Sequence, residues 1–393
     1  MSTLAQPPVS PTGTFFRKLL LAATACLLLA VSLGMLAFVT TNEKVANRDF
    51  IEYWAAGQQF VHGANPYDAN RIFALERSAG KHAPAPIIMF NPPSAVFLTL
   101  PLGYVSPRVG YLLWSLVLFG AWLGSIHLLW IMNGRSRNAR HFIGYFFAPA
   151  IASYSLGQMA MFVLLGITLF LYFHRTRPWL AGAALLLCAL KPHLFLPFWV
   201  ALLAWTVTRK VYRVALGAMA AVVISWIVPL FFDPSIYSQY AAMASTSGVS
   251  DLFMPTMSAL LRLAVNPNAF WIQFVPAFAG CIWAFWYFHR HRESWDWGRH
   301  GLLLIVVSFL VAPYAWYFDA VMLLPSLLYA VYRVSPSART VLVLLLVAAA
   351  VQMQLGVQPH SAWNLLPNMA WPVWYILSMR RPDPMRLPRE IES

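Results

Sequence analysis

The stretch AGAALLLCALKPHLFLPFWVALL, residues 181–203, contains two apolar segments separated by a Lys-Pro-His break at 191–193. Proline interrupts a helix, and ionisable side chains are rare inside membrane helices, so the break separates two helices. Arg177 precedes the stretch and Arg209 follows it. Because basic residues gather in cytoplasmic loops, this pair is predicted to cross outward, turn at the break and return.

The composition extends this pattern to the whole chain. Of its 393 residues, 60% are hydrophobic and 10% are charged, whereas a soluble protein has about 25% charged residues. Apolar runs near the length of roughly 20 residues that crosses a bilayer cover most of the sequence. The sequence therefore predicts an all-α polytopic membrane protein, one domain over residues 1–393, with about 11–13 transmembrane helices. The net charge of +14 comes from short basic clusters between apolar runs, which indicates cytoplasmic loops and not nucleic-acid binding.

The first apolar segment, residues 19–39, sets the orientation. It is too long for a signal-peptide core and no small-residue cleavage site follows it, so we expect a retained helix with residues 1–18 as a cytoplasmic tail. Residues 40–90 then form an outer loop, and residues 380–393 form a second cytoplasmic tail. The following segment, 91–102, is short for a crossing, and whether it crosses is left open by the sequence.

Several polar residues are predicted to meet on the outer side: Asp49, Glu52, Gln158, Lys191, His193, Arg262 and Asp319. Ionisable groups within or beside membrane helices are costly, which makes them candidates for a functional site. Structural roles are the alternatives. Asp49 and Glu52 have the spacing of a capping box, Gln158 could join helices, Lys191 could extend to the interface, and Asp319 could cap a helix.

The sequence has no Walker loop, GxGxxG, HExxH or GxSxG motif, and no Asp-x-Asp pair that would hold a divalent cation on a nucleotide sugar. Its three cysteines are far apart in apolar runs, so we predict no metal and no cofactor. A lone outer carboxylate near cations in a lipid setting fits glycosyl transfer from a polyprenyl-phosphate sugar. The carboxylate would take the proton of the acceptor hydroxyl, and Lys191, His193 or an arginine would stabilise the departing phosphate.

Five stretches carry a family resemblance: RDFIEYWAAGQQFVHGANPYD (48–68), NPPSAVFLTLPL (91–102), SLGQMAMFVLLG (155–166), residues 181–203, and APYAWYFDAVMLLP (312–325). In this order they resemble glycosyltransferase family 87, polytopic enzymes of the GT-C class that include polyprenyl-phosphate-mannose-dependent mannosyltransferases and arabinofuranosyltransferases. The resemblance runs from Asp49 to about Pro325. It implies a general base at Asp49 and donor-phosphate contacts from the segment containing Lys191. Family members often carry histidine in the late motif, where this chain has Trp316-Tyr317-Phe318-Asp319, which leaves open whether Asp319 takes part of that role.

The resulting hypothesis is a transferase that moves mannose or a related sugar from a polyprenyl-phosphate donor to a glycolipid or glycan acceptor, with inversion, at the outer face of the cytoplasmic membrane. Tyr53 and Trp54 are expected to pack the outer loop onto the bilayer or to stack on a sugar. The alternatives are a lipid or polysaccharide transporter or flippase, a non-catalytic subunit of an envelope assembly complex, and a ligase or polymerase of diphosphate-linked glycans.

Overall fold

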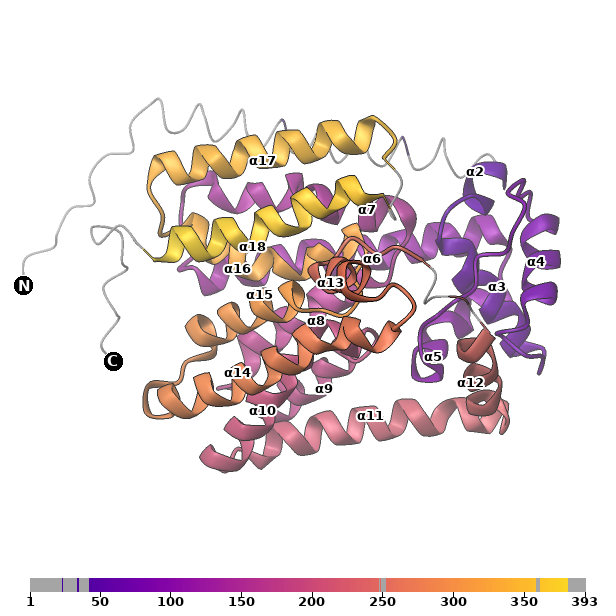
Figure 1. The fold of residues 1–393 in the computed structure, drawn as a ribbon. Coiled ribbons are helices and arrows are strands. Elements are labelled where there is room, and N and C mark those ends of the chain that lie inside the picture. Colours follow the sequence, from indigo (N-terminus) through magenta and orange to yellow (C-terminus); the bar gives the residue numbers. More distant parts are fainter. Residues whose placement is uncertain are drawn as a thin grey trace, which may run out of the picture.

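The computed structural model describes residues 42–246, 248, 252–357 and 361–380, together with residues 23 and 34. The predicted first helix and most of the two tails lie outside this range. Figure 1 shows long helices lying roughly side by side, with a group of shorter helices beyond one end of them. That group contains α2 (Asn42–Ala46), α3 (Phe50–Val61), α4 (Ala69–Ser78), α5 (Val96–Thr99) and α12 (Ile236–Thr246).

Within the described residues, four helices are long and apolar enough to cross a membrane. They are α6 (Pro107–Met132), α11 (Tyr212–Phe232), the segment Phe270–Ser294 that contains α14 (Val275–His291), and α17 (Pro336–Gln354). Shorter apolar helices are α8 (Ala160–Phe173), α9 (Pro178–Cys188), Trp297–Leu310, which contains α15 (Leu302–Leu310), and Tyr317–Val331, which contains α16 (Leu324–Val331). The predicted all-α polytopic fold is therefore confirmed, and the count of 11–13 crossings stays a prediction.

Both predicted helix breaks are present. Gly157, in the left-handed conformation with φ of 78°, ends α7 (Ala148–Leu156) just before α8. Pro192 starts a short 3-10 turn, η4 (Pro192–Phe195), between α9 and α10 (Leu196–Arg209). The last helix of the described residues is α18 (Leu365–Met379), which packs against α15, α16 and α17.

The segment at 91–102 does not form a crossing helix. It folds into η1 (Pro93–Ala95), α5 and η2 (Leu100–Tyr104), each only three to five residues long. These turns pack against α3, where Gly57 is essential to the close approach because a Cβ there would overlap the carbonyl oxygen of Thr99. The alternative in which this segment spans the bilayer therefore has no support.

The predicted outer loop is a packed unit, because α3 is enclosed by α4, α5, η2 and α6. Every residue from Phe50 to Gly57 is buried. The indole N–H of Trp54 donates to the carbonyl of Val105 (2.9 Å), and the Tyr53 ring packs on Trp114. Both side chains are buried and seat α3 on the helix bundle, so the expectation that Tyr53 and Trp54 pack on the bilayer is wrong, while stacking on a sugar stays a prediction.

Candidate active site

Asp49 is held by an amide side chain from a distant part of the chain. Its carboxylate makes no capping hydrogen bond to α3, so the capping-box interpretation is wrong. Instead, Gln158 Nε2 donates to Asp49 Oδ2 (2.6 Å), and Gln158 Oε1 accepts from the Tyr53 hydroxyl (3.0 Å). A carboxylate only accepts hydrogen bonds, so it fixes which way the amide of Gln158 points.

The corner between α7 and α8 places Gln158 there. Gly157 permits the left-handed turn, and a Cβ at Gly157 would lie 2.8 Å from Cβ of Phe50. The Trp114 indole donates to the Gly157 carbonyl (2.7 Å) and fixes the corner from the side of α6. Backbone contact between Gly157 and the start of α3 therefore brings Gln158 beside Asp49.

Two carboxyl groups, Asp49 and Glu52, lie within one turn at the start of α3, which is not among the candidate membrane spans. Burial raises the pKa of Asp49 above its usual range, while the Gln158 hydrogen bond and the charges of Lys191 and Arg48 lower it. Burial and the neighbouring Asp49 charge raise the pKa of Glu52 further, well above its usual range. Asp49 is therefore the group that stays ionised more readily, as a general base requires.

Lys191 and Asp319 form a buried ion pair (2.6 Å). The second carboxylate oxygen of Asp319 accepts from the backbone N–H of Trp316 (2.9 Å), which caps the 3-10 helix η9 (Tyr317–Leu323). The Lys191 ammonium also lies 4.9 Å from the centre of the Phe318 ring. The interpretation of Lys191 as a residue extending to the interface is wrong, and the capping role of Asp319 is confirmed.

An ammonium group has three N–H donors, so the contact with Asp319 leaves Lys191 able to bind a second acceptor. The backbone directly before Lys191 is held by Asn91, whose side chain donates to the carbonyl of Leu190 (3.2 Å). Lys191 is close enough for its charge to lower the pKa of Asp49. The break at Gly157 thus holds Gln158 beside the Asp49 carboxylate, and the break at Pro192 places the Lys191 cation close enough to stabilise the charge of that carboxylate.

His193 and Arg262 are connected by a row of aromatic side chains. The His193 ring, two residues after Lys191 in the chain, contacts the Tyr314 ring in a tilted arrangement, with ring centres 3.9 Å apart. Arg262, buried in α13 (Met257–Val265), lies 5.5 Å from the centre of the Phe270 ring. A row of aromatic contacts through Phe274 connects Phe270 with Tyr314, so these two residues lie along one aromatic row and not beside Asp49.

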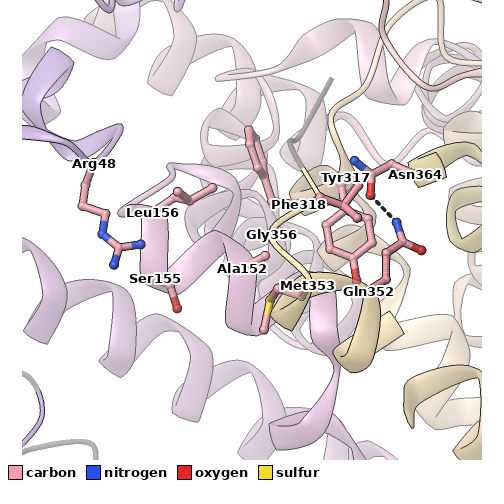
Figure 2. Close-up of a pocket in the computed structure, with 11 residues that line it drawn as sticks. Arg48, Ala152, Ser155, Leu156, Tyr317, Phe318, Gln352, Met353, Gly356 and Asn364 are labelled. Carbon is pink, nitrogen blue, oxygen red and sulfur yellow. Dashed lines mark hydrogen bonds between the residues drawn. The ribbon is translucent and has the colours of Figure 1, made fainter. Parts of the chain in front are cut away.

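A cavity of about 310 Å³ lies beside Arg48 and Phe318. It is lined by Arg48, Ala152, Ser155, Leu156, Tyr317, Phe318, Gln352, Met353, Gly356, Val357 and Asn364. In Figure 2, Arg48 lies at one side of the view, Tyr317, Gln352 and Asn364 lie at the other, and the end of α7 lies between them. Sequence reasoning missed the uncharged polar residues of this lining, because an uncharged side chain at a helix end gives no signal that distinguishes it from ordinary packing.

The sequence model of glycosyltransferase family 87 matches residues 90–359, which is more than half of the chain. The chain belongs to glycosyltransferase family 87. No curated protein and no solved structure matches it. The matched region of this family 87 chain contains Gln158, Lys191 and Asp319 but begins after Asp49, so the hydrogen bond from Gln158 is what connects the candidate base to the family region.

Proposed function

We propose that this chain transfers mannose or a related sugar from a polyprenyl-phosphate donor to a glycolipid or glycan acceptor at the outer face of the cytoplasmic membrane. The observation that carries the proposal is the Asp49 carboxylate, which is partly buried and oriented by the neutral amide of Gln158, with the Lys191 charge nearby. A carboxylate that only capped a helix would bond backbone N–H groups, and Asp49 makes no such bond to α3. Membership in a glycosyltransferase family supplies the reaction class.

Asp49 acts as the general base in this proposal. Gln158 occupies Oδ2, which leaves Oδ1 to accept the proton of the acceptor hydroxyl. As that proton moves to Asp49, the hydroxyl oxygen forms a bond to the anomeric carbon of the donor sugar. The bond between the anomeric carbon and the phosphate oxygen breaks, and polyprenyl phosphate leaves with the electron pair. A single displacement inverts the anomeric configuration.

Lys191 is proposed to neutralise the phosphate as its negative charge grows. The ion pair with Asp319 and the ring of Phe318 hold the ammonium in place before the donor arrives, so little reorganisation is needed in the transition state. Asp319 in this proposal is a positioning residue, because both of its carboxylate oxygens are already engaged by Lys191 and by Trp316. His193 and Arg262, on the aromatic row, and Tyr53, bonded to Gln158, are proposed as further substrate contacts or supports.

The test compares wild type with Asp49→Asn in proteoliposomes supplied with polyprenyl-phosphate mannose, then other polyprenyl-phosphate sugars, and a lipid extract as acceptor. Asp68→Asn is the matched control, since Asp68 caps α4 through Asn70 and Arg71 and asparagine caps equally well. We expect labelled product from wild type and the control and none from Asp49→Asn. Equal transfer by all three proteins would remove Asp49 as the base, and absence of transfer with every donor would argue against the transferase.

A further inference from the structure

The polar end of the cavity contains an unused hydroxyl. Tyr317 is 7% exposed and lines the cavity, and its hydroxyl has no hydrogen-bond partner among the described residues. Burying a hydroxyl without a partner is costly, so an unpaired group of this kind calls for an explanation such as a bound ligand. The Tyr317 hydroxyl is therefore a candidate ligand contact.

An amide pair lies at the same end of the cavity. Gln352 Nε2, at the end of α17, donates to Asn364 Oδ1 (2.6 Å), which belongs to the turn η10 (Ala362–Asn364). Using the Gln352 amide nitrogen in this way fixes the amide and leaves its carbonyl oxygen as an acceptor. A hydroxyl donor from Tyr317 and an amide acceptor from Gln352 together match the hydroxyl groups of a sugar, each of which both accepts and donates.

Much of the remaining lining fits the apolar face of a sugar ring. Phe318, Met353, Ala152 and Leu156 contribute carbon surface, and among the described lining residues Arg48 is the one charged side chain. Ligand pockets usually have volumes of about 300–1,000 Å³, so a cavity of about 310 Å³ is at the small end. That size suits one sugar ring.

The other side of the cavity is lined by sequence neighbours of the candidate base and of its partner Gln158. Arg48 lines it and directly precedes Asp49 in the chain. Leu156 and Ser155 line it from the end of α7, next to the corner that holds Gln158. A sugar in the cavity would therefore lie between the end of α7 and Arg48 on one side and Tyr317 and Gln352 on the other (Figure 2).

We propose that this cavity binds one uncharged glycosyl unit of a substrate, with Tyr317 and Gln352 contacting its hydroxyl groups at the end away from Asp49. The proposal rests on the transferase function, because that unit is either the sugar of the donor or the terminal sugar of the acceptor. Both have the same chemistry, and kinetics distinguishes them.

The kinetic test uses Tyr317→Phe and Gln352→Leu in full-length protein in proteoliposomes. Tyr332→Phe is the matched control, a buried tyrosine beyond the same helical segment that does not line the cavity. Removing one neutral hydrogen bond should raise one KM roughly five- to tenfold, with kcat changed less. A rise in the donor KM assigns the cavity to the donor sugar, and a rise in the acceptor KM assigns it to the acceptor. Unchanged values for both substrates would overturn the proposal while leaving the transferase intact.

A binding measurement keeps the proposal testable if no transfer is found. Thermal unfolding of the detergent-purified protein is followed with octyl mannoside, octyl glucoside, octyl galactoside and octyl arabinofuranoside. We expect at least one to stabilise wild type and Tyr332→Phe, with a smaller shift for Tyr317→Phe. No stabilisation of wild type by any of the four, or an equal shift in all three proteins, would overturn the sugar site.

Discussion

The ion pair between Lys191 and Asp319 offers a double-mutant test of whether Lys191 is structural or functional. The two charged atoms are 2.6 Å apart, and their side chains are only 10% and 1% exposed. Removing one member of such a pair leaves an uncompensated buried charge, which costs about 3–5 kcal/mol. Lys191→Met should therefore destabilise the protein by about that amount.

The second substitution, at Asp319, removes the negative charge that Lys191→Met leaves without a partner. Asp319→Asn keeps an oxygen that can accept from the Trp316 backbone N–H, as Asp319 does now, so the cap on η9 survives. Because the residues are in contact, their effects on stability should not add, and the double variant should regain about 1–3 kcal/mol relative to Lys191→Met. Thermal unfolding in detergent micelles measures this coupling.

Transfer activity then separates the two roles. We expect the double variant to unfold at a higher temperature than Lys191→Met and still to transfer sugar poorly, because the cation that meets the donor phosphate is absent. Recovery of transfer together with stability would refute the functional role and leave Lys191 as a structural residue. A Lys191→Met variant as stable as wild type would refute the inference that the pair is buried and coupled.

Three other predictions follow from the start of α3 and from the Gly157 corner that packs against it. Asp49 must be ionised to act as a base, and burial raises its pKa. The value of kcat/KM should therefore fall as the pH drops through that raised pKa. A pH profile that stays flat down to about pH 4, the ordinary pKa of aspartate, would contradict this. Glu52→Gln should keep most of the activity, because the strongly raised pKa of Glu52 favours the neutral acid that glutamine resembles, and complete loss would point to Glu52 as the base. Gly157→Ala should lower the free energy of unfolding by about 1–3 kcal/mol, because alanine is strained in the left-handed backbone conformation, and the unfolding temperature should fall. It should also reduce transfer, because the new Cβ pushes on Phe50. Unchanged stability and transfer would show that the corner relaxes.

The sequence by itself determined the helices and their breaks. Apolar runs of about 20 residues have few folded alternatives in a bilayer, since every backbone group must be satisfied within its own segment. Polar residues inside such runs are costly, so the sequence alone is enough to select Gln158 and Lys191 as candidates. The break at Gly157 and the turn after Lys191 lie where the sequence placed them.

Only the tertiary structure decided which of these residues act together. Asp49 and Gln158 are 109 positions apart, and Lys191 and Asp319 are 128 apart, and no local pattern encodes a contact over such distances. Local spacing suggested that Asp49 caps its own helix, but packing of Gly157 against Phe50 provided a stronger partner in Gln158. The cavity depends in the same way on residues from five separate segments. Helix formation is local and can be predicted from the sequence, whereas a site arises where helices pack, and packing is set by the shapes of side chains far apart in the chain.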